Sequence, residues 1–260
     1  MSSVTQRINA IKQPRGGYVK LSQFDVHKIE DGHILNENEN IHASIIGMAV
    51  DYLTRYAMGS ELTTAFKTSY MGAKIAEENF KQKNAITNAI QLLSEINNID
   101  EKAIINACKL VTYDVWLRNS MGAKMATGAD ETNPDVATIQ NIKILIERSV
   151  NFWENYGPIV KDGFTFDPNG YTDTVNSGDG DYLTADTLWD FKVSKSKPTN
   201  KYTLQLLMYW IMGKHSGQKV FNNIHKLGIF NPRLNEVYLL NISTISKEII
   251  SEIEHDVICY

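Results

Sequence analysis

Residues 178–192 read Gly-Asp-Gly-Asp-Tyr-Leu-Thr-Ala-Asp-Thr-Leu-Trp-Asp-Phe-Lys, and this stretch decides the fold that we expect. In its second half, polar and apolar residues alternate. The two-residue period of a strand then sends Trp189 and Phe191 to one face. Asp190 and Lys192 share the opposite face. The alternation therefore predicts a strand that carries an acid and a lysine side by side.

The first half of the stretch predicts a second strand, antiparallel to the first. A turn centred on Ala185-Asp186 predicts three cross-strand pairs: Leu183 with Leu188, Tyr182 with Trp189, and Asp181 with Asp190. Like charges directly opposite on a sheet are destabilising unless a cation lies between them. Hard divalent cations such as Mg²⁺ take oxygen ligands of this kind, and a lysine beside the metal can orient water or neutralise charge on a phosphate. The pattern therefore predicts a site that cleaves phosphodiesters.

Three motifs, in this order and spacing, resemble the PD-(D/E)XK nuclease superfamily, particularly its RecB-like branch. Gly-x-x-Asp at residues 178–181 is followed after eight residues by Asp-x-Lys at 190–192. Residues 205–209 are similar to the Gln-x-x-x-Tyr helix that follows the Asp-x-Lys strand in RecB-like nucleases. Residues 47–51 resemble the Gly-x-x-x-His helix of that family, with Asp51 where histidine is usual. The resemblance covers residues 42–55 and 178–209.

The resemblance implies a role for each matching residue. The metal ligands would be the carboxylates of Asp181 and Asp190 and the backbone carbonyl of Phe191, with Asp51 as a further ligand. Lys192 would activate water and stabilise the phosphate. The expected cofactor is Mg²⁺, with Mn²⁺ as a substitute.

Other residues of the motifs have two interpretations each. Gln205 and Tyr209 lie four residues apart on one helix face. The resemblance makes them contacts to the substrate or to the aspartates, whereas a buried polar pair satisfied within the core is the alternative. Asp51 is either a metal ligand or the partner of Arg55 at i+4 in its own helix.

The charge of the chain reverses sign at the predicted active strand. The net charge is −4, but residues 162–190 hold seven aspartates and no Lys or Arg, whereas residues 191–233 hold eight Lys or Arg and no acid. An acidic metal pocket bordered by lysines is what binding a polyanion through a metal requires. We expect these lysines to contact DNA: Lys195, Lys197, Lys201, Lys214 and Lys219. A solvated lysine face is the alternative.

Hydrophobic periodicity predicts an α/β fold in three parts. Residues 1–40 form an irregular arm with one short strand near 18–21; residues 41–59, a buried helix, and 157–260 form an α/β core; and residues 60–156 form a helical region packed on it. The order of elements after residue 157 fits an α/β sandwich around a mixed sheet. The resemblance implies a PD-(D/E)XK (restriction-endonuclease-like) mixed central sheet flanked by helices, with an all-helical insertion. Within that region, residues 71–76 nearly repeat as 121–126, which indicates a duplicated helical hairpin or a coincidence.

Composition indicates the setting of the protein. The two cysteines are far apart in sequence, no apolar run reaches membrane-spanning length, and the stretch from Met1 to Gly17 lacks the apolar core of a signal peptide. We therefore expect a soluble cytoplasmic protein that does not contact membranes. The resemblance suggests a prophage or phage-defence setting.

The function that we expect is a magnesium-dependent nuclease that acts on DNA, with RNA as the alternative substrate. Two further hypotheses explain the acidic residues without a cleavage reaction: a non-cleaving nucleic-acid-binding module with the same fold, and a structural metal site. Lys192 argues against both, because a cation on the same face would compete with the metal. We also hypothesise that the helical region is the interface of a homodimer.

Overall fold

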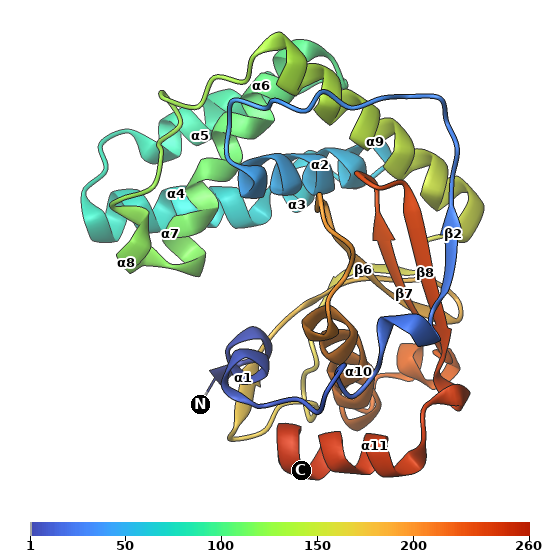
Figure 1. Cartoon of the computed structure of the whole chain (residues 1–260). Helices are drawn as coiled ribbons and strands as arrows, with labels where there is room; N and C mark the ends of the chain where they lie inside the picture. Colours follow the sequence, from blue (N-terminus) through green and yellow to red (C-terminus); the bar gives the residue numbers. More distant parts are fainter. Residues whose placement is uncertain (1) are drawn as a thin grey trace. The chain divides into compact units, whose positions relative to one another are not determined.

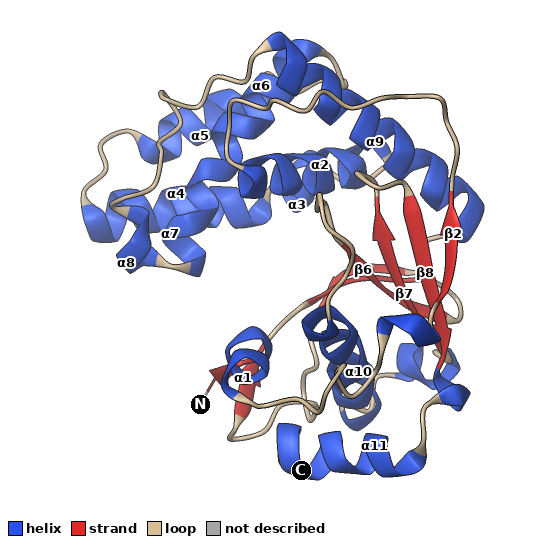
Figure 2. Cartoon of the chain, in the orientation of Figure 1, coloured by secondary structure: helices blue, strands red, loops and turns tan. Residues whose placement is uncertain are grey.

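The computed structural model describes residues 2–260 and divides the chain into two compact units (Figure 1). The α/β unit comprises Met1–Glu30 and Phe152–Tyr260, and the helical unit comprises Asp31–Asn151. All strands of the described residues lie in the α/β unit, as the red segments of Figure 2 show. Among the described helices, none combines the length and apolar character that spanning a bilayer requires.

A mixed six-stranded sheet is the centre of the α/β unit. Its strand order is β2-β8-β7-β6-β5-β3, and β6 and β7 are parallel whereas the other neighbours are antiparallel. The strands are β2 (Asp25–Lys28), β3 (Lys161–Phe164), β5 (Gly180–Leu183), β6 (Thr187–Phe191), β7 (Lys226–Asn231) and β8 (Glu236–Asn241). A separate two-stranded sheet pairs β1 (Ser2–Ser3) with β4 (Val175–Ser177). The expected α/β class with a mixed sheet flanked by helices is confirmed.

The predicted hairpin of residues 178–192 is formed by β5 and β6. Tyr182 pairs with Trp189 and Leu183 with Leu188, as expected from the alternation. The turn closes where Thr184 N–H donates to the carbonyl of Thr187 at 3.0 Å. A two-residue loop of this kind sets the register of the whole hairpin.

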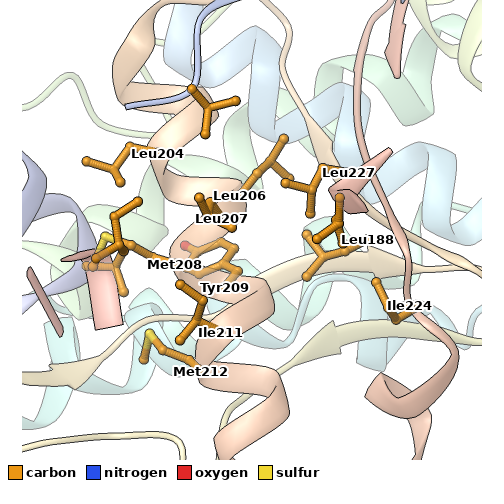
Figure 3. Packing of buried hydrophobic residues seen from close by; sticks show 14 of the residues in the cluster. Leu188, Leu204, Leu206, Leu207, Met208, Tyr209, Ile211, Met212, Ile224 and Leu227 are labelled. Carbon is orange, nitrogen blue, oxygen red and sulfur yellow. The ribbon is translucent and has the colours of Figure 1, made fainter. Parts of the chain in front are cut away.

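Each face of β6 is buried under a different layer. Leu188 and the β7 residue Leu227 pack against the helix α10 (Asn200–His215), which connects β6 to β7 (Figure 3). On the other face, Trp189 meets Phe152 edge-on with centroids 4.9 Å apart. Phe152 also stacks on Phe230 at 4.0 Å. Since both faces are covered, a charged residue in β6 has to be buried.

The prediction of an irregular arm over residues 1–40 was wrong where α1 and β2 form, whereas residues 11–20 and 29–40 are irregular as expected. Helix α1 (Val4–Ala10) begins with a capping box in which Ser3 accepts from Gln6 N–H and the Gln6 side chain accepts from Ser3 N–H. The 3₁₀ turn η1 (Leu21–Gln23) occupies part of the stretch for which a strand was predicted, and the strand is β2, an edge strand paired with β8. Because β8 lies near the opposite end of the chain, local pattern did not reveal this pairing.

The helical unit packs α2 on α6, and α4 on α5 and α7. Its helices are α2 (Ala43–Ala57), α3 (Leu62–Ala65), α4 (Lys67–Phe80), α5 (Ala85–Ser94), α6 (Glu101–Leu110), η2 (Val111–Tyr113), α7 (Asp114–Arg118), α8 (Ser120–Ala123) and most of α9 (Val136–Tyr156). The α/β unit is completed by η3 (Lys219–Asn223), η4 (Ile242–Thr244), α11 (Lys247–Glu252) and the π-helix η5 (Ile253–Ile258).

The division into units differs from the expected domains in two places. The segment Met1–Glu30 joins the α/β unit, because Val4 and Ile8 of α1 lie in the core cluster that α10 covers. Helix α2, expected in the α/β core, belongs to the helical unit because it packs on α6.

Candidate functional site

The candidate site lies where the parallel strands β6 and β7 both end. Phe191 at the end of β6 pairs with Phe230 of β7, and Lys192 N–H donates to the Phe230 carbonyl at 2.9 Å. The chain then passes through α10 before it returns as β7. In α/β sheets, the carboxyl ends of parallel strands are where ligands bind, because the crossover leaves side chains and loops there.

Asp190 and Lys192 form a close ion pair at this edge. Lys192 Nζ lies 2.6 Å from Asp190 Oδ1, and only 2% of the Asp190 side chain is exposed against 23% for that of Lys192. Among the described residues, no donor reaches the buried oxygen Oδ2 of Asp190. Burying a carboxylate is costly unless its oxygens are satisfied. The site thus presents one carboxylate oxygen that is ready for a cation or a donor.

Asp181 is the second acid, and it does not form the predicted ladder pair with Asp190, because the β5–β6 ladder ends at Tyr182 with Trp189. Its Oδ2 accepts a hydrogen bond from Phe191 N–H at 2.8 Å, beyond the last backbone pair of the hairpin, Tyr182 with Trp189. The carboxylate therefore replaces a ladder hydrogen bond and holds the backbone of Phe191 between the two acids. The sequence placed Asp181 opposite Asp190, but this side-chain bond depends on how the strands separate after Tyr182.

The two acids shape the electrostatics of the site together. Burial lowers the pKa of Lys192, but the charges of Asp190 and then Asp181 outweigh it, so the pKa is raised above its usual value. Burial raises the pKa of Tyr209, and Asp181 and Asp190 raise it further although the Gln205 hydrogen bond opposes them. At neutral pH Lys192 is therefore charged and Tyr209 is a neutral phenol.

Helix α10 brings Gln205 and Tyr209 to the site. Gln205 Nε2 donates to Tyr209 Oη at 2.7 Å, and 5% of Tyr209 is exposed. Figure 3 shows Tyr209 on α10 among the buried hydrophobic residues. The i,i+4 pair thus forms as the helical spacing predicted. The bond pairs a half-buried amide with a buried phenol, close to the alternative interpretation, and the charges of the two acids also act on Tyr209.

Tyr202 is a further residue of this site, and no motif of the sequence includes it. The ammonium of Lys192 lies 5.2 Å from the centroid of the Tyr202 ring, at a distance typical of a cation–π contact. Tyr202, Gln205 and Tyr209 are spaced i, i+3 and i+7, which is one face of a helix. That spacing was the available signal, and it was overlooked because Tyr202 lies outside the Gln-x-x-x-Tyr motif.

Gly178, the first residue of the motif, packs between α1 and α10. A Cβ there would lie 2.9 Å from Val4 Cγ2 and 3.7 Å from the Tyr209 ring, and φ is +155°. Its carbonyl accepts from Tyr171 Oη at 2.6 Å. A side chain at this position would push α1 away from the start of β5, so the position requires glycine.

The predicted DNA-contacting lysines lie at two ends of α10. Lys195 and Lys197 are exposed in the segment after Lys192, and Lys201 is exposed in the first turn of α10, where its Nζ donates to Asn9 at 2.6 Å. Lys214 and Lys219 are exposed near the other end of the helix. At the rise of an α-helix, Lys201 and Lys214 are separated by about 20 Å. Lys195, Lys197 and Lys201 thus follow the active strand directly in the chain, and Lys214 and Lys219 follow the far end of α10.

Asp51 lies in α2 of the helical unit. Its two carboxylate oxygens accept from Arg55 Nε at 3.1 Å and Arg55 Nη2 at 3.2 Å. The i+4 pairing expected from the spacing is thus present. The role of Asp51 as a metal ligand stays a prediction from the resemblance.

The donor set of the site fits a hard divalent cation with several water ligands. Over residues 2–260, no group of three or more His, Cys, Asp or Glu side chains is arranged to enclose a metal. Mg²⁺ does not need such a cage, since it keeps several waters and is often held by one or two carboxylates. The features that fit are the buried Oδ2 of Asp190 and the Asp181 carboxylate, which is bonded to the backbone of the residue that follows Asp190.

No family model, curated protein or solved structure gives a significant match to this chain. The side chains at the carboxyl edge of β6 and β7 are thus the basis for assigning a chemistry.

Proposed function

We propose that the chain hydrolyses phosphodiester bonds in DNA with the help of a divalent metal ion. The observation that carries the proposal is the Asp190 carboxylate, which is buried at the end of a central strand with one oxygen on Lys192 and the other without a donor among the described residues. A protein selected only for stability would gain from replacing such a half-satisfied acid, because an unpaired buried oxygen costs about 1–3 kcal/mol. Retaining it suggests a ligand.

The surroundings of Asp190 indicate what that ligand is. Asp181 adds a second negative charge, and both acids raise the pKa of Lys192 and of Tyr209. Two carboxylates beside a neutral phenol attract a hard cation and have little affinity for an anion unless that cation is present. Mg²⁺ held by Asp181, Asp190 and the Phe191 carbonyl would supply Lewis acidity toward a phosphate oxygen.

The remaining residues have roles that follow from their contacts. Lys192 is charged and lies beside Asp190, so its ammonium can stabilise negative charge on a phosphate or orient water. Tyr202 holds that ammonium through its ring. Tyr209 and Gln205 form a neutral pair that can donate to the acids or to the substrate without adding charge.

DNA is the substrate that the charge pattern favours. Residues 191–233 carry eight basic residues and no acid, and Lys195, Lys197 and Lys201 are exposed near the site. Lysines of this kind bind phosphates through counterion release, which makes binding depend strongly on salt. A polyanion would thus be attracted beside the acids and reach them through the metal.

The test is cleavage of labelled linear and circular duplex DNA with Mg²⁺, with Mn²⁺ and with EDTA. We expect cutting that needs the metal and that falls by about 100-fold or more in Asp190→Asn and in Lys192→Met, since removing one group that stabilises charge in the transition state typically costs that much. Cutting of the circular substrate would identify an endonuclease, and cutting of the linear one alone an enzyme that needs ends.

The same hairpin offers a matched control. Asp186 in its turn accepts from Lys226 at 2.8 Å, which is an acid–lysine pair on the same strands but at the other end of β6. Asp186→Asn and Lys226→Met should leave cutting within threefold of the wild type. If the Asp186 and Lys226 variants lost as much cutting as the Asp190 and Lys192 variants, the losses would be due to impaired folding. Salt-dependent duplex binding without cutting of DNA or RNA would favour the non-cleaving binding module instead.

A further inference from the structure

We propose that Asn231 is a positioning residue that fixes the segment after Lys192 and so presents Lys195 and Lys197 to a polyanionic substrate. The inference rests on the proposed function, since it assigns these lysines to the same substrate. Asn231 is the last residue of β7 and is fully buried. It has no place in the three motifs of the sequence.

The side chain of Asn231 bonds to backbone on both sides. Its Nδ2 donates to the carbonyls of Ser194 at 2.8 Å and Ser196 at 3.4 Å. Its Oδ1 accepts from Arg233 N–H at 3.0 Å and from Ser194 N–H at 3.4 Å. One buried amide thus connects the end of β7 to the segment that leaves β6, using both its donor and acceptor sides.

The backbone hydrogen bonds between β6 and β7 end where the four hydrogen bonds of the Asn231 side chain begin, and we call these four bonds the clamp. Lys192 N–H still donates to the Phe230 carbonyl, and the next contact between the two segments is that of Asn231. Within the segment, Ser194 N–H donates to the Lys192 carbonyl at 3.1 Å and Ser196 N–H to Ser194 Oγ at 3.1 Å. These short-range bonds bend the backbone of residues 192–196, and the Asn231 side chain connects this bend to the end of β7.

The clamp matters for binding because of what it holds. Lys195 and Lys197 flank Ser196, and all three are exposed, so between the half-buried Val193 and the buried Pro198 no side chain of the segment is anchored by burial. A segment without its own core would be mobile, and ordering it would reduce the affinity gained from each lysine contact. If the segment is already ordered in the free protein, this ordering cost does not reduce the affinity for DNA.

The test compares Asn231→Ala and Asn231→Asp with a control at the same turn. Aspartate keeps the acceptor for Arg233 N–H but loses the donors to Ser194 and Ser196. Asn235 is also buried, with 3% exposed, and its Nδ2 donates to Ile29 on the opposite side of the turn. Asn235→Ala removes a buried amide and also places alanine at a φ of +52°, so it should destabilise the turn at least as much without touching the segment after Lys192.

Amide hydrogen exchange and duplex binding are the two readouts. In both Asn231 variants we expect the amides of Ser194 and Ser196 to exchange at least tenfold faster while those of β6 and β7 stay protected. The Kd for duplex DNA should rise about tenfold, about 1.4 kcal/mol of binding free energy, with kcat changed less than threefold. Asn235→Ala should leave both readouts of the segment unchanged.

Each contrary result overturns a stated part of the inference. Unchanged exchange at Ser194 and Ser196 would exclude the clamp, and faster exchange throughout the α/β unit would make Asn231 a general stabilising residue. A fall in kcat larger than the rise in Kd would show that Asn231 acts on Lys192 and not on Lys195 and Lys197. If the wild type binds duplex without cutting, the proposed hydrolysis fails but the clamp is still decided by exchange and Kd. If it does not bind at all, the role assigned to the two lysines is overturned.

Discussion

Two buried acid–base pairs show how the environment of a single residue decides its use. In the helical unit, Asp31 engages Arg148 through both carboxylate oxygens, with Arg148 Nη2 3.0 Å from Oδ1 and Nε bonded to Oδ2. In the α/β unit, Asp190 gives Lys192 one oxygen and keeps the other without a donor among the described residues. Both carboxylate oxygens of Asp31 are thus bonded within the protein, whereas Asp190 retains one oxygen for a ligand.

The Asp31 pair leads to a prediction about stability and pH. Hydrogen bonding by Arg148 holds the pKa of Asp31 below its usual 3.8 against the opposing effect of burial. A depressed carboxyl pKa contributes stability that is fully present above the unfolded-state value and is lost as the pH falls through the lower folded value. We expect Asp31→Asn to lower the unfolding free energy by about 1–3 kcal/mol at neutral pH. The deficit should shrink as the pH falls below 3.8, in urea titrations at a series of pH values.

A surface pair provides the comparison for that titration. Glu30 lies 2.9 Å from Lys28, with both side chains more than half exposed. Glu30→Gln should change stability by less than about 0.5 kcal/mol at any pH, because exposed pairs contribute little. A deficit for Asp31→Asn that did not depend on pH would rule out the charge as its source.

At the scale of elements, local pattern predicts strands and helices but not every packing detail. The alternation of residues 187–191 and the turn at Ala185-Asp186 led to the correct hairpin register. The near-repeat of residues 71–76 and 121–126 has no common structure, since the first lies in the long helix α4 and the second runs through the short helix α8 and beyond its end. Sequence similarity over so short a stretch therefore did not indicate a duplicated hairpin.

The two glycines of that near-repeat should respond differently to alanine. A Cβ on Gly72 would lie 2.0 Å from the backbone carbonyl oxygen of Tyr113, so α4 would have to move away from the chain that crosses it. We expect Gly72→Ala to lower the unfolding free energy by about 1–3 kcal/mol, as overpacking commonly does. Thermal unfolding followed by circular dichroism measures this loss.

Gly122→Ala is the matched control. Its Cβ would lie 2.7 Å from Asn119 Nδ2, and moving that side chain would weaken its cap on Gly122 N–H, while alanine gains helix propensity over glycine, so the two effects oppose each other. The net change should stay within about 1 kcal/mol of zero. If Gly122→Ala were the more destabilising of the two, the close approach at Tyr113 would not be the reason for glycine in α4.

At the scale of the whole molecule, the α/β unit is assembled from both ends of the chain. Val4 and Ile8 of α1 are buried in the cluster under α10. Arg7 donates to the carbonyls of Val257 and Asp256, each at 2.8 Å. Helix α1 is thus part of the core of a unit whose candidate site residues lie far along the chain, in β5, β6 and α10.

This assembly predicts that the two units lose protection separately. Ile8→Ala should destabilise by about 2–5 kcal/mol, the range for truncating a buried isoleucine. Hydrogen exchange should then accelerate in β6 and β7 of the α/β unit while the amides of α2 and α6 keep their protection. Ile104→Ala, at a fully buried position of α6, should give the reverse pattern. Equal acceleration in both units by either variant would show that the chain unfolds as one cooperative unit.

The sequence by itself determined the α/β class and the central hairpin, and it pointed to five residues of the candidate site, namely Asp181, Asp190, Lys192, Gln205 and Tyr209. These follow from period-two alternation, helical spacing and a two-residue turn, which act between residues close together in the chain. The capping box of Ser3 and Gln6 was equally local and could have revealed α1.

Tertiary structure alone decided the remainder. It placed β2 beside β8, set the Asp181 carboxylate on Phe191 N–H, left Oδ2 of Asp190 without a donor among the described residues, and used Asn231 to hold the segment after Lys192. Each of these depends on which segments become neighbours once the apolar faces are buried. Hydrogen-bond partners at that distance carry no periodic signal in the sequence, because burial selects the neighbours before geometry selects the bonds.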